Sequence, residues 1–523
     1  MREWRLRIVI LALLAVIVGV PLLLRREGPG STNPGTAPAA DAYRIRLIVM
    51  TPHGEQIRDE FAAAFNRWRI SQGHAPVAFD WRTGGTNDLK NQAVAEFEAK
   101  ARQGREDQGI EKDLFFGGGD FTFNQLAAGL TVTRDEALVH VAILAPLQVP
   151  PALLKQVFPS PTIGGERLYQ KDLLWVGVAL SSFGIVYNRD CLTTIGLPEP
   201  ATWSDLADRR YRTWLALADP AHSGSVATTY DTILRRLGWE QGWKVLRRCF
   251  ANARYVTDSG SRVPVDVSAG EAAAGMCIDY YGRFQSGAVG GGRVGYVDPA
   301  GMTAITADPV ALLRGAPHAE LAQEFALWLL SPEAQGLWQR RIGTPGGPER
   351  YELRRLPIRV DMYQPREMQT WTDQVNPFAI ARPAPPGMPR FGDLVPALTH
   401  AIAIDTKDEL VAALQAVEAH PDHPHAAEMA ALLDALPPDL QTLWPADWSD
   451  DLRRQWGAVV DDNRDPRRDA VIATAPDTVV GVMIRWKLAR ARHDQDALLT
   501  DQARWTSFFR SNYRRIVALS EQR

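Results

Sequence analysis

The chain contains few cysteines and no excess of basic residues. Three of its 523 residues are cysteine, Cys191, Cys249 and Cys277, at spacings that match no metal-site pattern. An odd number leaves at least one thiol free or paired with another molecule, and buried free thiols are the simplest interpretation. The 58 Lys and Arg are scattered among 61 Asp and Glu, for a net charge of -3. This balance argues against nucleic-acid binding.

Catalytic signatures are also missing. No Gly-x-Ser-x-Gly or His-Glu-x-x-His pattern occurs, so an extracytoplasmic hydrolase is the least favoured function and we expect no enzymatic activity. Three histidines, His420, His423 and His425, lie close together, but Pro421 and Pro424 between them predict a loop between helices. We therefore expect no metal there.

The N-terminus carries the feature that indicates the compartment. Residues 8–24 are uncharged and lie between arginines on both sides. The run is longer than the apolar part of a typical signal peptide and slightly short for a membrane span, which flanking arginines could extend. No small-residue cleavage site follows directly, which favours a retained anchor, although a cleaved signal stays open. No cysteine lies nearby, so a lipoprotein anchor is excluded. Residues 27–41 resemble a flexible tether, which places the folded body outside the cytoplasmic membrane.

Beyond the tether, strands and helices alternate. Residues 43–50 predict a strand, 55–69 an amphipathic helix and 77–81 a second strand. Residues 113–116 predict the next strand, with three glycines after it. Ligands of open α/β sheets collect at such strand ends. We expect an α/β domain with its site at this edge.

The middle of the chain predicts a passage between two lobes. Residues 176–187 form an apolar run interrupted by Ser181 and Ser182, which fits one buried strand crossing into a second lobe. The chain is expected to return near residue 280, so that the two lobes hinge near 180 and 280. Polar groups in a buried strand need partners, either backbone or a bound solute.

Several polar turns are candidate ligand contacts. Ser223, Gly224 and Ser225 directly precede a predicted helix, and such a helix start can hold an anion without a lysine. His53 follows the first strand, and glycines in the 117–120 turn permit close approach of a ligand. The full set of candidate ligand-binding residues is His53, Gly118, Gly119, Asp120, Ser181, Ser182, Ser223, Gly224, Ser225, Asp258, Ser259, Asp279 and Tyr281.

Beyond residue 348 the pattern changes to long helical stretches. They cover 408–418, 426–436, 450–460 and 479–522, after a proline-rich linker at 382–389. We expect this tail to pack against the second lobe.

The order of these segments resembles the extracellular solute-binding proteins that serve ATP-driven importers, in the branch of ferric-iron, thiamine and phosphonate binders. The resemblance covers residues 43–350. It rests on the segments 47–54, 113–119, 178–188, 219–225, 270–281 and 325–335. It implies an α/β, type II two-lobed periplasmic-binding-protein fold with a helical C-terminal extension.

The resemblance also implies a division of the chain. Residues 1–41 would be the N-terminal membrane anchor or signal segment with its tether. Residues 42–187 and 284–345 would form lobe 1, residues 188–283 lobe 2, and residues 346–523 a mainly helical extension.

A metal-bound cargo is a further implication of the resemblance. In the ferric branch adjacent tyrosines bind Fe(III), a hard ion that prefers anionic oxygen ligands. Here Tyr280, Tyr281 and His53 could take these parts, with Glu55 or Asp279 as the carboxylate. The sequence at 278–283 departs from the ferric pattern, and only Tyr281 matches it securely. Aromatic walls for an organic solute are the alternative. No cofactor is expected, and Fe(III) would be cargo.

The function expected from the resemblance is that of a binding component of an ABC-type importer. Its lobes would close on a small anionic, phosphorylated or metal-bound solute in the periplasm and deliver it to a membrane permease. The alternative is a membrane-anchored sensor or accessory subunit with the same fold, whose helical tail contacts a partner.

Overall fold

The computed structural model describes residues 45–522, apart from 135–136, 291, 462–464 and 493. The predicted anchor or signal at 8–24 and the tether at 27–41 therefore lie outside the described residues, and both stay predictions. Within the described residues, no helix combines the length and apolar character needed to cross a membrane.

The first lobe is built on a mixed sheet whose strands run in the order β16-β9-β15-β3-β1-β2, with β6 also paired to β15. β1, β2 and β3 are parallel, whereas β15 runs antiparallel to both β3 and β9. The strands are β1 (Ile45–Thr51), β2 (Val77–Thr83), β3 (Leu114–Phe116), β6 (Leu144–Ala145), β9 (Val176–Ser181), β15 (Thr306–Leu313) and β16 (Leu356–Pro357).

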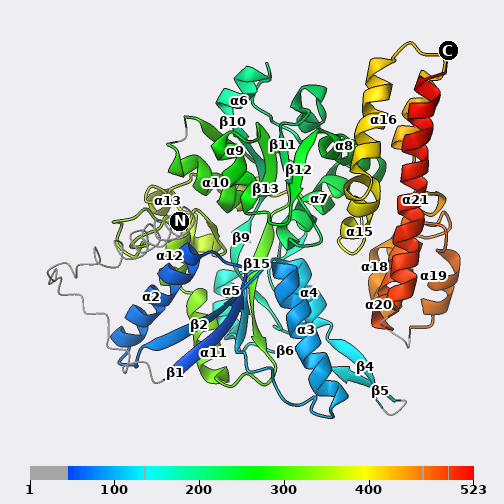
Figure 1. The fold of residues 1–523 in the computed structure, drawn as a ribbon. Helices are drawn as coiled ribbons and strands as arrows, with labels where there is room; N and C mark the ends of the chain where they lie inside the picture. Colours follow the sequence, from blue (N-terminus) through cyan, green and yellow to red (C-terminus); the bar gives the residue numbers. More distant parts are fainter. Residues whose placement is uncertain (1–44, 135–136, 291, 462–464, 493, 523) are drawn as a thin grey trace, which may run out of the picture. The chain divides into compact units, whose positions relative to one another are not determined.

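Helices cover both sides of this sheet. In Figure 1, α2 (Glu55–Ser71), α11 (Ala319–Leu329) and α12 (Pro332–Gln339) lie on one side, and α3 (Thr86–Arg102) and α4 (Asp120–Ala127) on the other. The amphipathic pattern of α2 buries Phe61 and Phe65 against Trp328, with ring centroids 5.9 and 5.2 Å apart. The Ser331 side chain caps α12 by accepting from Ala334 N, with Pro332 in the first turn.

Short elements complete the first lobe. They are the hairpin β4 (Leu130–Arg134) and β5 (Ala137–Val141), helix α5 (Pro151–Val157), and the pair β7 (Thr162–Ile163) and β8 (Glu166–Arg167). After β16 follow η4 (Val360–Met362), α13 (Pro365–Met368) and α14 (Pro377–Ile380).

The second lobe has its own sheet, in the order β12-β11-β13-β10-β14. Its strands are β10 (Phe183–Asn188), β11 (Leu215–Ala218), β12 (Ala253–Thr257), β13 (Ala274–Ile278) and β14 (Val294–Val297). Its helices are α6 (Arg189–Thr194), η2 (Trp203–Ala207), η3 (Arg209–Tyr211), α7 (Gly224–Leu237), α8 (Trp239–Asn252), α9 (Arg262–Ala269) and α10 (Asp279–Ala288). Two sheets with flanking helices confirm the predicted two-lobed α/β class.

The passages between the lobes differ from the prediction. The expected single crossing strand is two strands, β9 in the first sheet and β10 in the second, separated at Ser182. The chain returns not near 280, where α10 begins, but between β14 and β15. A hydrogen bond from Ser182 Oγ to Asp298 Oδ1, 2.7 Å long, joins the two passages. We therefore propose lobe boundaries at about 182 and 298–305 in place of 187/188 and 283/284.

The first lobe also continues beyond residue 345. Leu356 pairs with Leu180 of β9 in the first sheet, and the neighbouring Arg355 and Ile358 are buried. The sequence pattern missed this strand because it has only two residues and carries no alternation. We accordingly propose that the helical extension begins near residue 390 rather than at 346.

The extension comprises α15 (Val395–Thr399), the π-helical turn η5 (His400–Ile404), α16 (Lys407–Ala419), α17 (Ala426–Asp434), η6 (Pro438–Leu440), α18 (Asp450–Asp461), α19 (Arg468–Thr474), α20 (Val479–Ala491) and α21 (Gln495–Ser520). The helix predicted over 479–522 is therefore two helices. The break has a local cause, because Asp494 caps α21 by accepting from Ala497 N.

The extension packs on the second lobe, as predicted. Trp239 Nε1 of α8 donates to Leu440 O over 2.8 Å, and the buried Arg247 donates to the carbonyls of Leu433 and Ala435. Lys407 of α16 donates to Ala253 O at the end of α8. Each of these two cations thus meets the carbonyls at a helix end, where the backbone carries partial negative charge.

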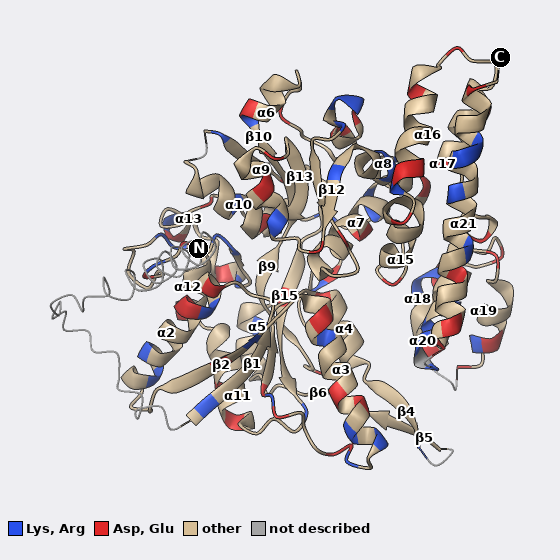
Figure 2. Cartoon of the chain, viewed as in Figure 1, with Lys and Arg blue, Asp and Glu red and all other residues tan. Residues whose placement is uncertain are grey.

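Two other sequence predictions concern surface charge and thiols. Figure 2 shows acidic and basic residues interspersed along the described elements, while the expected lack of nucleic-acid binding stays a prediction. All three cysteines are buried and free, which confirms the simplest interpretation. Burial raises the pKa of the Cys249 and Cys277 thiols, so they are poor nucleophiles.

The contact between extension and second lobe is expected to depend on pH. The His400 imidazole bonds Asp219 at 2.9 Å and Asp405 at 3.0 Å, and the bond to Asp219 chiefly raises the pKa of His400 from 6.5 to about 9. Because folding raises the pKa of His400, the protonated imidazole stabilises the folded state. This contribution is fully present below pH 6.5 and disappears as pH rises through 9. We expect the free energy of unfolding to fall over that window. Urea denaturation at several pH values should show a flatter dependence for His400→Gln, and an unchanged dependence would contradict the assignment.

Candidate functional site

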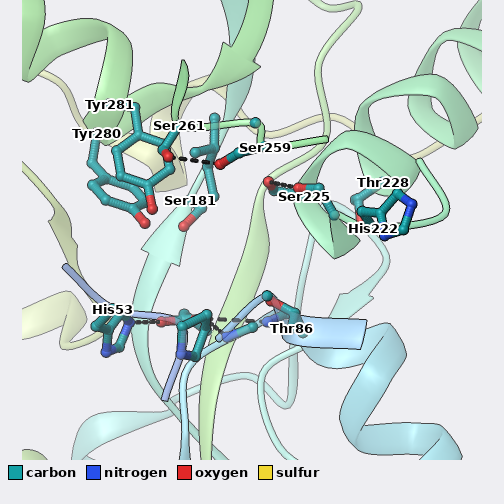
Figure 3. Close-up of a pocket in the computed structure, with 18 of the residues that line it drawn as sticks. His53, Thr86, Ser181, His222, Ser225, Thr228, Ser259, Ser261, Tyr280 and Tyr281 are labelled. Atoms are coloured by element: carbon teal, nitrogen blue, oxygen red, sulfur yellow. Dashed lines mark hydrogen bonds and ion pairs between the residues drawn. The ribbon is translucent and has the colours of Figure 1, made fainter. Parts of the chain in front are cut away.

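A cavity of about 390 Å³ lies between the two lobes. Figure 3 shows Tyr280, Tyr281, Ser225 and Ser259 of the second lobe on one side, facing His53 and Thr86 of the first lobe. The lining is formed by Pro52, His53, Gly84, Gly85, Thr86, Asp88, Gly118, Gly119, Ser181, Phe183, His222, Ser223, Ser225, Thr228, Asp258, Ser259, Gly260, Ser261, Ile278, Tyr280, Tyr281, Thr306, Ala307, Asp308 and Arg355.

The starts of six helices meet at this cavity. They are α2, α3 and α4 from the first lobe and α7, α9 and α10 from the second, and residues at or beside each start line the cavity. The capping positions are Gly54, Gly85, Gly119, Ser223, Ser261 and Ile278, and no side-chain capping bond occurs at any of these six described starts. First-turn N–H groups and helix dipoles together favour an anion.

On the second-lobe side, two Ser-Gly-Ser turns lie against each other. Ser223 Oγ is 3.1 Å from Ser225 Oγ, and Ser259 Oγ is 2.9 Å from Ser261 Oγ. A Cβ on Gly260 would come within 3.0 Å of Ser223 Oγ, so glycine allows this close approach. The result is four hydroxyl groups at the starts of α7 and α9, and the hydroxyl of each pair that does not donate to its neighbour can donate to an oxyanion.

On the first-lobe side, the glycine turn before α4 is held by a buried carboxylate. Gly117, Gly118 and Gly119 have φ values of 89°, 121° and 83°, which favour glycine. The Gly118 and Gly119 amides donate to Asp308 Oδ1 over 2.7 and 3.2 Å. Glycine is thus needed here for the positive φ values of the turn. Two of the amides that could bind an anion already donate to Asp308.

A buried ionic cluster forms the floor of the cavity. Asp308 Oδ2 lies 2.9 Å from both His53 Nε2 and Arg355 Nη1. Arg355 Nη2 donates to Ser181 Oγ over 2.9 Å, and its guanidinium lies 4.5 Å from the Tyr280 ring centroid. The side chains of His53, Asp308 and Arg355 are at most 3% exposed. Arg355 is thereby fixed under the tyrosine pair by contacts on several sides.

The charge states of this cluster follow from burial and from Arg355. Burial is the main cause that lowers the pKa of His53, so the imidazole is neutral at pH 7. Burial alone would raise the pKa of Asp308, but the charge of Arg355, the hydrogen bond with His53 and the Gly118 amide together outweigh burial and hold that pKa well below its usual range. The floor is therefore an ion pair with a neutral histidine beside it.

The tyrosine pair begins a helix instead of ending a strand. β13 ends at Ile278, and Tyr280 and Tyr281 lie in the first turn of α10, with ring centroids 4.1 Å apart. Both rings therefore face the cavity, which neighbouring positions on one strand would not allow. Burial raises the pKa of both hydroxyls, most strongly that of Tyr280. The pair can donate hydrogen bonds or form an aromatic wall.

The predicted metal set has an obstacle at His53. Its Nε2 is engaged by Asp308 and Arg355, and its Nδ1 is buried. Metal binding by His53 together with Tyr280 and Tyr281 stays a prediction, and it would require those contacts to break. Among the described residues, one other group has atoms close enough for a cation, namely Asp219, His222 and Asp258. In this group the Asp219 carboxylate already bonds the His400 imidazole.

Nine of the thirteen residues predicted to touch ligand line the cavity, and four lie behind it. Asp120 pairs with Arg390. Ser182 points to Asp298, Gly224 lies against Thr86 and Gly118 O, and Asp279 is fully buried. These four corrections share one cause, since a pattern in sequence does not fix which neighbour of a lining residue faces inward.

Burial raises the pKa of the Asp279 carboxyl group to about 7.

Several lining residues were not predicted from the sequence. Arg355 and Asp308, which form the floor, lie 47 residues apart in sequence and outside the segments that predicted the site. Thr86, the first residue of α3, also lines the cavity. Ser261 belongs to the second Ser-Gly-Ser turn, and its repetition of the 223–225 pattern was the available signal.

Part of the chain is similar in sequence to known proteins. A family model described as bacterial extracellular solute-binding protein matches residues 150–360. That stretch contains the whole second lobe, both passages and Arg355. The phosphoglycerate transport regulatory protein PgtC of Salmonella typhimurium is 29% identical over 166 residues, which is 31% of this chain and 39% of PgtC. The chain thus spans less than half the length of this curated relative.

Solved structures of low identity are also similar. The periplasmic binding protein AfuA from Actinobacillus pleuropneumoniae, with fructose-6-phosphate bound, is 17% identical at a TM-score of 0.49 and covers 70% of this chain and 97% of its own. Iron-bound HitA from Pseudomonas aeruginosa is 18% identical at a TM-score of 0.46, with 65% and 92% covered. Over residues 150–360 the family match confirms the resemblance inferred from the sequence, which is to the bacterial extracellular solute-binding proteins.

Proposed function

We propose that the protein captures a small oxyanion-bearing solute, foremost a phosphorylated one, between its two lobes outside the cytoplasm. The observation that carries this proposal is the meeting of six helix starts at one cavity. Their first-turn amides and the serine hydroxyls at 223, 225, 259 and 261 supply donors, and the hydroxyls of Tyr280 and Tyr281 supply more.

Phosphorylated carboxylic acids are the first ligand class to consider. PgtC, the relative named above, is a phosphoglycerate transport regulatory protein. A molecule of that size fits a cavity of about 390 Å³. One anionic end would face the two Ser-Gly-Ser turns, and the other would lie near Tyr281 and Arg355.

Delivery of the solute to an ABC-type permease is part of the proposal. It is supported by the family match, and the membrane attachment through residues 8–24 stays a prediction. The matching family is one of binding proteins, and the expected absence of catalysis is also still a prediction.

A sensor or accessory subunit is the second candidate function. Two observations favour it: PgtC is called a regulatory protein, and the extension packs on the second lobe. This candidate would be favoured by two results together. A membrane partner would co-purify with the full chain but not with a chain that lacks the extension, and loss of the protein would leave solute uptake unchanged.

Thermal melting with a ligand panel tests the proposal. The panel contains 3-phosphoglycerate, fructose-6-phosphate, a phosphonate, thiamine and ferric citrate. A ligand at a hundred times its Kd stabilises the folded protein by about 2.7 kcal/mol, which gives a clear rise in Tm. We expect 3-phosphoglycerate to raise Tm. A rise with ferric citrate alone, together with iron in the purified protein, would establish the metal alternative instead.

A further inference from the structure

One segment of the extension touches both lobes directly behind the cavity. We call residues 390–400 the strut. The strut contacts α4 and α7, and both of these helices begin at the cavity. The contacts of Trp239, Arg247 and Lys407, given above, join the extension to the second lobe.

On the first lobe, the strut pairs with α4 and β8. Arg390 Nη1 lies 2.8 Å from Asp120 Oδ2, the first residue of α4, and Arg390 also pairs with Glu166. Further along α4, Gln125 Nε2 donates to Asp393 Oδ1 over 3.1 Å. Gly392 lies so close to Phe121 that a Cβ would come within 2.7 Å of the ring. The strut follows α4 over more than one turn.

On the second lobe, the strut pairs with α7 and α8. The Phe391 amide donates to Asp231 Oδ1 over 2.5 Å, and the Phe391 ring lies 4.6 Å from that of Trp239. At the other end of the strut, His400 binds Asp219, four residues before Ser223. Glu166 also bonds Arg235 of α7 over 2.7 Å, so one ionic cluster connects both lobes and the strut.

This cluster lies immediately behind the proposed ligand site. A void of about 20 Å³ among Asp120, Glu166, Asp231, Arg235 and Arg390 shares Thr228 and Thr306 with the main cavity. The carboxylates of Asp120, Glu166 and Asp231 are at most 9% exposed. A buried carboxylate that loses its partner costs several kcal/mol, so the cluster is stable only while the lobes hold their present spacing.

We propose that the strut responds to closure of the lobes and regulates ligand affinity: it docks between α4 and α7 when the cleft is closed and loosens when the cleft opens. The proposal rests on the proposed function, because it assigns regulation to the same cleft. Since coupling between two sites is reciprocal, a ligand that closes the lobes orders the strut, and a docked strut raises affinity. Arg390 is then a positioning residue, acting on the site through α4.

A cross-link tests the proposal without any ligand. Asn87 Nδ2 of α3 donates to Ala221 O across the cleft over 3.0 Å. In the full chain carrying Asn87→Cys and Ala221→Cys, a disulfide or a short bis-maleimide would hold the lobes together, and the three native thiols are buried. We expect amide exchange in 390–400, above all at Phe391, to slow at least about fivefold in the linked form. Equal exchange in linked and unlinked protein overturns the proposal.

A second experiment measures the affinity of two strut variants for 3-phosphoglycerate. Arg390→Gln is expected to lower affinity about tenfold although Arg390 does not line the cavity, and Asp393→Asn about threefold. The second variant serves if the first fails to fold. Arg510→Gln is the matched control, because it removes an ion pair with Glu409 inside the extension and should leave affinity unchanged.

The outcomes separate the two proposals. If the wild type binds 3-phosphoglycerate but neither the cross-link nor the variants have an effect, the strut proposal fails and the proposed function stands. If the wild type does not bind 3-phosphoglycerate, the proposed ligand class fails. Amide exchange in the cross-linked protein then still tests the strut proposal.

Discussion

Ser225→Asp is expected to lower affinity for 3-phosphoglycerate by roughly a hundredfold without destabilising the protein. Ser225 is the second residue of α7 and lines the cavity beside Ser223. A carboxylate there would meet the solute's own negative charge, and like-charge contacts cost several kcal/mol. The same carboxylate favours the helix, because α7 has no acidic residue in its first turn, and the gain is about 0.3–1 kcal/mol.

Calorimetric titration and thermal melting together check this prediction. Ser225→Ala is the matched control, since it removes one hydroxyl and adds no charge, and it should cost only about tenfold in affinity. Unchanged binding by Ser225→Asp would show that the start of α7 does not hold the anion.

Arg355→Met is expected to destabilise the folded protein by about 3–5 kcal/mol. Methionine has a similar length, so the change chiefly removes the charge. Asp308, which is 3% exposed, would keep its negative charge in the interior with only two amides and a neutral histidine near it. The midpoint of urea unfolding should fall accordingly, and ligand binding should be lost.

Two comparisons separate the ion pair from general packing. Arg359→Met removes an equally buried arginine, but its partner Asp361 is 44% exposed and can be solvated, so the loss should be smaller. In Arg355→Met/Asp308→Asn the orphaned charge is gone, and part of the stability should return. Additive losses in this double variant would refute the coupling between the two side chains.

Local patterns predicted most of the fold. The amphipathic spacing of α2 and the buried run at 176–187 each depend on neighbours in sequence, and both are present. What local patterns could not supply was pairing between distant segments. That Ser182 separates two sheets, or that β16 joins β9, depends on contacts made only in the folded chain.

The same limit applies to the site. Ser223 and Ser225 line the cavity, and they were predicted because a Ser-Gly-Ser turn before a helix can hold an anion. Arg355 was missed because its role depends on Asp308 and Ser181, which lie far from it in sequence. Asp120 and Asp279 belong to segments predicted to touch ligand, yet Asp120 pairs with Arg390 and Asp279 is fully buried.

The position of β15 has a consequence for the order in which the lobes fold. β15 lies between β9 and β3 in the first sheet, although it follows both in sequence by more than a hundred residues. The strands of the second sheet, β10 to β14, are contiguous in sequence, so that lobe can form as soon as residue 297 is available. Until residues 306–313 arrive, β9 and β3 each present an unpaired edge, which favours misassociation. During synthesis or secretion, the first lobe to begin is therefore the last to be completed.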